Sequence, residues 1–168
     1  MRLLILSDVH ANIAALHAIE RDAGYVDAIY CAGDYVDYGT DPHEAIAWMR
    51  EHGAHCVMGN HDRHLLNILA SDETERFRGT PQYKWVHDNC ERVTEEDVAW
   101  LCRLPRHLSF SADGAAYVMQ HQMKDGAYDM PESLAQFEQC FSAWSTGEAQ
   151  PLCRMIFGHT HRRCVHQL

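Results

Sequence analysis

Leu3-Leu4-Ile5-Leu6-Ser7-Asp8-Val9-His10 joins an unbroken apolar run to two side chains that can bind a metal ion. A short continuous apolar run predicts a strand that is covered on both faces, as in a parallel sheet. Asp8 and His10 are two residues apart, so on an extended segment their side chains point the same way and can hold one ion. The stretch therefore predicts a strand over residues 2–6 with a metal site at its end.

The residues that follow alternate between helical and strand-like patterns. Helical spacing over 12–23 precedes a second predicted strand at 28–32, and a third is predicted at 54–58. Between them, Asp41-Pro42-His43-Glu44 is typical of a helix start, with a capping Asp, Pro at the first helical position and Glu three residues after the cap. This order predicts parallel pairing with right-handed crossovers, and ligands then gather at the carboxyl ends of the strands.

Further metal-ligand side chains follow the predicted strands. They lie in Gly33-Asp34-Tyr35-Val36-Asp37, in Gly59-Asn60-His61-Asp62, at His121 and in Gly158-His159-Thr160-His161. The set offers carboxylate, amide and imidazole donors without a thiolate, so Mn, Fe, Zn, Ni and Mg all fit. Asp34 has one carboxylate oxygen for each of two metals. Two divalent ions about 3.5–4 Å apart can hold a hydroxide that attacks phosphorus in line with the leaving oxygen.

A leaving alkoxide must be protonated, which requires a general acid. His61 lies between Asn60 and the acidic Asp62, so we predict that His61 is this acid and that Asp62 orients it and stabilises its charged form. Asp37 fits either a turn residue or a residue that contacts the site from behind.

The rest of the chain predicts one domain, 1–168, with a helical insertion at about 62–104. Strands are predicted at 108–111, 115–120 and 154–157. Leu134, Phe137, Phe141 and Trp144 form the apolar stripe of one more helix.

Composition limits the classes of partner. The net charge of −10 argues against an extended nucleic-acid surface, which needs clustered cations. No stretch is long and apolar enough to cross a membrane, and the first apolar run is too short for a signal peptide. Seven cysteines, an odd number with no Cys-x-x-Cys pair, suit a reducing cytoplasm.

The ordered motifs Asp8-Val9-His10, Gly33-Asp34, Gly59-Asn60-His61-Asp62 and Gly158-His159-Thr160-His161 resemble those of the calcineurin-like metallophosphoesterases, most closely the small bacterial and archaeal phosphodiesterase branch. The resemblance implies an α/β fold, a β-sandwich of two mixed sheets flanked by helices. It also implies two divalent metal ions and identifies His61 as the catalytic histidine. One ion would be held by Asp8, His10, Asp34 and His161, and the other by Asp34, Asn60, His121 and His159.

The chain departs from the family's pattern at three places. Ala11 and Gln122 stand where glycine is usual, and Gln122 directly follows the predicted ligand His121. Relatives usually continue through further strands after the last motif, whereas seven residues follow His161 here. We therefore expect the second sheet to lack its C-terminal strands, and an unpaired edge there would favour a homo-oligomer.

Three functions stay open. The first is a cytoplasmic, metal-dependent phosphodiesterase acting on a small phosphoester, with a nucleotide-type molecule as the favoured substrate. The second is a Ser/Thr protein phosphatase, which Gly33-Asp34-Tyr35-Val36-Asp37 resembles, although Tyr38 stands where its phosphate-binding Arg is expected and Asp62 replaces its usual Glu. The third is a catalytically weak interaction module, for which the retromer subunit of this fold is a precedent.

Overall fold

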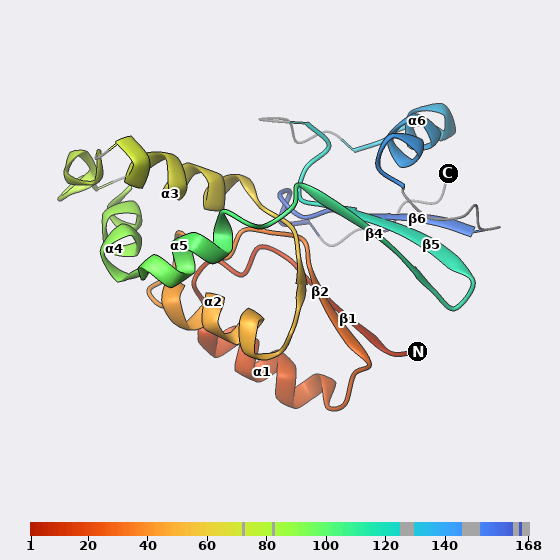
Figure 1. Cartoon of the computed structure of the whole chain (residues 1–168), viewed down its shortest axis with the longest axis horizontal. Coiled ribbons are helices and arrows are strands. Elements are labelled where there is room, and N and C mark those ends of the chain that lie inside the picture. The colour runs from red at the N-terminus through yellow and green to blue at the C-terminus, as the bar shows by residue number, and fades with distance from the viewer. Residues whose placement is uncertain (72, 82, 125–129, 146–151, 163–164, 166–168) are drawn as a thin grey trace.

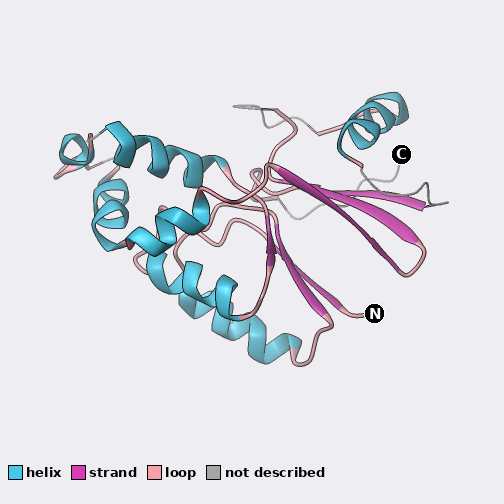
Figure 2. Cartoon of the chain, viewed as in Figure 1, coloured by secondary structure: helices cyan, strands magenta, loops and turns pink. Residues whose placement is uncertain are grey.

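The computed structural model describes residues 1–71, 73–81, 83–124, 130–145, 152–162 and 165. Two three-stranded sheets pack against each other, and helices cover the outer side of each (Figures 1 and 2). In chain order the elements are β1 (Leu3–Leu6), α1 (Ile13–Ala23), β2 (Ala28–Cys31), α2 (Pro42–Glu51), β3 (His55–Cys56), α3 (Asn60–Ser71), the 3-10 helix η1 (Thr74–Phe77), α4 (Lys84–Arg92), α5 (Glu95–Leu101), β4 (His107–Ala112), β5 (Ala115–Gln120), α6 (Leu134–Trp144) and β6 (Leu152–Ile156). The predicted two-sheet α/β fold is confirmed.

The first sheet has the order β1-β2-β3 and is parallel, as the strand–helix alternation predicts. The third strand is shorter than predicted, covering only His55–Cys56. Helix α1 begins after Asn12, whose side chain accepts a hydrogen bond from Ala15 N at 3.0 Å. Helix α2 begins where predicted, but the prediction that the Asp41 side chain caps it is wrong. Its carboxylate accepts from Thr40 Oγ1 instead and makes no bond to the helix.

The segment predicted to be helical, 62–104, contains α3, η1, α4 and α5. Helix α3 begins at Asn60, so the motif residues Asn60, His61 and Asp62 occupy its first turn. Helix α5 begins with a capping box, in which the Thr94 hydroxyl accepts from Asp97 N and the Asp97 carboxylate accepts from Thr94 N. In Figure 1 these helices lie on the side of α2 that is opposite α1.

The second sheet is mixed, because β4 and β5 are antiparallel whereas β5 and β6 are parallel. The prediction that both sheets are mixed is confirmed for this sheet, whereas the described strands of the first sheet are all parallel. Helix α6 covers its outer face, where Phe137 and Phe141 pack with residues of β5 and β6.

The inner faces of the two sheets meet in an apolar cluster. Tyr30 of β2 stacks on Phe110 of β4 with ring centroids 3.8 Å apart, and Val57 and Met119 are buried beside them. A larger cluster lies between the first sheet and the helices, around Leu16, Ile46 and Leu65. The sheets are thereby fixed so that the loops after β1, β2, β3, β5 and β6 converge. Within the described residues, no helix is both long enough and apolar enough to span a membrane.

Candidate metal centre

All seven predicted metal ligands lie in these converging loops or in the first turn of α3. The backbone holds the loops together, since Asp8 N donates to Gly33 O and His10 N donates to Asp34 O, each at 3.0 Å. These bonds continue the β1–β2 ladder beyond the strand ends, so that Asp8 and Asp34 leave the sheet side by side.

Asp8, His10 and His161 form the first group whose donor atoms could share an ion. The Nε2 atoms of His10 and His161 are 3.2 Å apart, and His161 Nε2 lies 3.3 Å from Asp8 Oδ1. Asp8 is positioned further by His159 N and by the Ser7 hydroxyl, both of which donate to its carboxylate.

Asp34, His121 and His159 form the second group. His121 Nε2 lies 3.1 Å from Asp34 Oδ2 and 2.8 Å from Asn60 Oδ1, which adds the amide oxygen to the set. The side chain that follows His121, Gln122, therefore does not displace this histidine from the group. Each of the two groups contains three of the four residues that the family resemblance assigns to one ion.

Asp34 lies between the two groups. Its Oδ2 is 3.1 Å from His121 Nε2 and 3.9 Å from His10 Nε2, and the residue is only 1% exposed. Oδ1 accepts from His61 N, whereas Oδ2 is buried and has no hydrogen-bond partner among the described residues. A buried carboxylate oxygen needs a compensating partner. A pair of cations supplies that partner, so the residues present fit two divalent ions.

Two of the candidate ligand histidines are oriented by the backbone through Nδ1. His10 Nδ1 lies 2.9 Å from Val36 O, and His121 Nδ1 lies 2.7 Å from Ala32 O. A carbonyl oxygen can only accept, so each Nδ1 carries a hydrogen, and Nε2 is the atom of each ring that would bind an ion.

Backbone conformation at the centre is unusual. Among the described residues, every non-glycine residue with positive φ except Asp113 lies at or beside the site. They are Asp8, His10, Ala11, Asp34, Asp37, Tyr38, His159 and His161. A left-handed conformation costs a non-glycine residue about 1–2 kcal/mol, and such strain concentrates at functional sites.

Two glycines are required by close contacts. A Cβ at Gly59 would lie 2.0 Å from Asp34 Oδ1, and a Cβ at Gly158 would lie 1.9 Å from Ser7 Oγ and 2.8 Å from Asp8 Oδ2. The motif glycines therefore leave room for the predicted ligands to approach the backbone.

The predicted pairing of His61 with Asp62 is wrong. His61 Nδ1 lies 2.7 Å from Oδ2 of Asp37, which is 1% exposed. Asp62 instead accepts from the backbone N–H groups of Asp34, Tyr35 and Gly59, at 2.8 to 3.0 Å. Asp62 thus ties the loop after β2 to the start of α3, and Asp37 orients His61.

The pKa values follow from burial and charge. Burial lowers the pKa of His61, but the hydrogen bond to Asp37 and the charge of Asp34 outweigh it and raise the pKa overall. For His10, burial prevails and lowers the pKa, which favours the neutral form. Burial, then the charge of Asp34, raises the pKa of Asp62 to about 7, against the lowering effect of its amide donors.

Comparison with known proteins agrees with this geometry. The model of the calcineurin-like phosphoesterase superfamily domain matches residues 1–168. The chain belongs to this superfamily. It is 28% identical to an uncharacterised protein of Methanocaldococcus jannaschii over 119 residues. This aligned region covers 70% of this chain and 47% of that protein.

Two crystal structures extend the comparison. The metallophosphoesterase of Sphaerobacter thermophilus is similar with a TM-score of 0.66 and 28% identity, over 96% of this chain and 61% of that one. A hypothetical protein of Pyrococcus horikoshii shares the fold, with a TM-score of 0.59 and 17% identity, over 84% of this chain and 64% of that one. The chain thus spans less than two thirds of the length of each of these relatives.

Proposed function

We propose that the protein is a phosphodiesterase that uses two divalent cations, with Asp34 as the bridging ligand. The observation that carries this proposal is the buried Asp34 Oδ2, which lies between His10 and His121 without a hydrogen-bond partner among the described residues. Asp8, His10 and His161 would complete one set of ligands. Asn60, His121 and His159 would complete the other.

When bound, the two cations supply a water of lowered pKa and neutralise charge on the phosphoryl group. The protein's own part is to orient the ester and to move one proton. Hydrolysis forms one P–O bond to the water oxygen and breaks the bond to the leaving oxygen, which must gain a proton. His61 would donate it from Nε2, since its Nδ1 is held by Asp37.

Tyr38 favours the diesterase over the protein phosphatase. Its hydroxyl lies 3.4 Å from His61 Nε2, and its ring packs 4.6 Å from that of His10 and 4.8 Å from that of Trp85. Where an arginine would bind a dianionic monoester, the chain thus presents a neutral aromatic surface beside the proton donor. A diester carries one charge fewer and has a second organic substituent that such a surface can contact.

We further propose that the substrate is a small, nucleotide-type phosphoester and that the protein works in the cytoplasm. Free thiols support the second point, because Cys31, Cys56, Cys90, Cys102 and Cys140 form no disulfide within the described part of the chain.

The test is hydrolysis of a panel of mono- and diesters by metal-stripped protein before and after addition of Mn²⁺ or another divalent ion. We expect diester hydrolysis that chelation abolishes and Mn²⁺ restores. Asp34→Asn should be nearly inactive, because a neutral amide bridges two cations poorly, whereas Asp22→Asn on the exposed surface of α1 should behave as the wild type. Metal binding without hydrolysis of any ester would instead favour an interaction module.

A further inference from the structure

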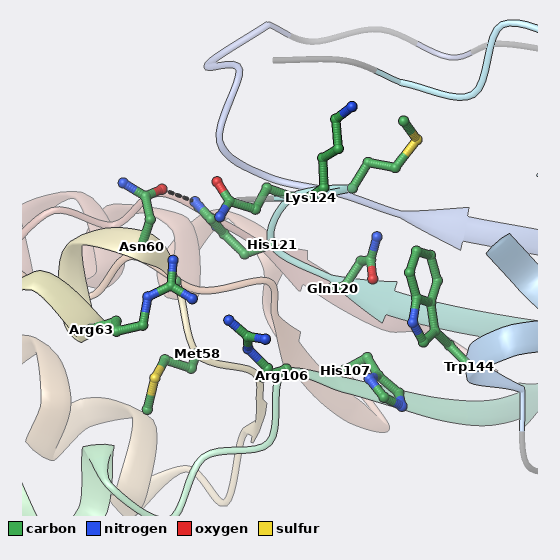
Figure 3. A pocket seen from close by; sticks show the side chains of 12 residues that line it. Met58, Asn60, Arg63, Arg106, His107, Gln120, His121, Lys124 and Trp144 are labelled. Carbon is green, nitrogen blue, oxygen red and sulfur yellow. Dashed lines mark hydrogen bonds between the residues drawn. The ribbon is translucent and has the colours of Figure 1, made fainter. Parts of the chain in front are cut away.

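A cavity of about 660 Å³ adjoins the second group of candidate ligands. Asn60 and His121 lie at one end of it, and His107 and Trp144 lie at the other (Figure 3). Its volume is in the range of pockets that bind small organic ligands, about 300–1,000 Å³. A group bound here would be continuous with a phosphoryl group at the metal centre.

The cavity is cationic in a strongly acidic protein. The whole chain has 14 Lys and Arg against 24 Asp and Glu, yet Arg63, Arg106 and Lys124 all line this cavity and none of its described lining residues is acidic. The three cations come from α3, from the segment before β4 and from the segment after β5. In Figure 3, Arg63 and Arg106 border the space between Asn60 and Gln120 from below, whereas Lys124 lies on the opposite side and extends away from both arginines.

Gln120 gives a second, independent indication of a ligand, one that carries a hydrogen-bond acceptor. It is the last residue of β5, it is 4% exposed, and it lines the cavity. Its Nε2 is a donor with no hydrogen-bond partner among the described residues. A buried amide donor left without an acceptor costs free energy, so the site favours a ligand that brings an oxygen to this position.

The far end of the cavity is aromatic. Trp144, the last residue of α6, is half-buried and its ring centroid lies 6.2 Å from that of His107. A flat heteroaromatic ring could stack there on the indole face. Acceptor oxygens would then lie near the cations, and the ring would lie farthest from the metal centre.

We propose that this cavity binds a nucleoside oligophosphate group, with its phosphates beside Arg63, Arg106 and Lys124 and its base against Trp144. The inference rests on the proposed function, because it makes this group one substituent of the phosphoester that is hydrolysed. The cavity would thereby select substrates that carry additional phosphates over esters with neutral substituents.

The test is calorimetric binding of adenosine, AMP, ADP and ATP to the full chain in excess chelator, which removes divalent ions and all turnover. Because each added phosphate gains charge-assisted hydrogen bonds, ATP should bind at least about tenfold more tightly than AMP. Arg63→Gln, Arg106→Gln and Lys124→Gln should each reduce this ratio by about three- to tenfold. Arg21→Gln, on the exposed surface of α1, is the matched control and should leave it unchanged. Trp144→Leu should weaken all four ligands by a similar factor.

Equal affinity for AMP and ATP, or a ratio that the three cavity variants do not change, would overturn the proposal. The two proposals fail separately. A selective cavity without diester hydrolysis after metal is restored would refute the phosphodiesterase alone. Hydrolysis without preference for oligophosphates would refute the cavity's role alone.

Discussion

The hydrogen bond between Asp37 and His61 makes a sharp prediction about catalysis. Asp37→Asn replaces a buried carboxylate with an amide of nearly the same shape, so the contact with His61 Nδ1 can persist without the charge. The imidazolium form of His61 then loses its nearest compensating charge. We expect slower hydrolysis wherever His61 must deliver a proton to the leaving group.

The magnitude follows from the geometry. The 2.7 Å contact involves a carboxylate that is 1% exposed and an imidazole that is 22% exposed. Hydrogen bonds to charged groups contribute about 1.5–3 kcal/mol, and each 1.36 kcal/mol in the barrier changes the rate tenfold. The loss for Asp37→Asn should therefore be about 10- to 150-fold on an alkyl diester. His61→Ala should lose about 10²- to 10⁴-fold, the usual contribution of a general acid.

The assay compares kcat/KM for an alkyl diester and for a p-nitrophenyl diester, whose leaving group needs no proton. Both variants should retain activity on the p-nitrophenyl ester within about threefold, with unchanged metal content. In the His61→Ala background, Asp37→Asn should have no further effect, because the two residues act as one unit. Equal losses on both esters, or full additivity in the double variant, would refute the assignment.

Two further predictions concern packing and stability. Gly59→Ala would place a Cβ 2.0 Å from Asp34 Oδ1, so kcat/KM should fall by at least about 100-fold. The control is Gly53→Ala, which has open space around its Cβ and should cost only about 1 kcal/mol of stability and no activity. Full activity in Gly59→Ala would contradict this prediction. The hydrogen bond to buried Asp97 raises the pKa of His43, so protonated His43 stabilises the fold below its unfolded pKa of about 6.5, and that contribution is lost as the pH rises through the folded value. In urea unfolding, His43→Asn should be less stable than the wild type near pH 5 and as stable as the wild type near pH 9. The difference at pH 5 should be small because the His43 side chain is 42% exposed. An equal difference at both pH values would refute the prediction.

Much of the centre could be predicted because several of the predicted ligands directly follow predicted strands. Asp8, Asp34 and Asn60 follow strands of one parallel sheet, and parallel pairing brings the ends of such strands together regardless of the rest of the chain. The apolar stripe from Leu134 to Trp144 likewise defines a helix with those bounds.

The partner of His61 could not be predicted in this way. Asp62 is its neighbour in sequence, but consecutive residues of a helix do not face each other, and both lie in the first turn of α3. Asp37 contacts His61 from a turn in which its own backbone is left-handed, with φ of 67°. The sequence shows an aspartate at this position but not the turn that directs its side chain toward His61.

The cationic cavity was missed for a different reason. Arg63, Arg106 and Lys124 belong to no shared motif, and the segments that carry them meet only through the packing of the two sheets. Composition argued against a broad anion-binding surface, which a local cluster of three cations does not contradict.

We expect side chains from five converging segments to hold two neighbouring cations. Anomalous diffraction from crystals of Mn²⁺-loaded protein, combined with metal analysis of the same preparation, tests it most directly. We expect two ions per chain about 3.5–4 Å apart, with Asp34 coordinating both. A single ion, or two ions that do not share Asp34, would contradict it.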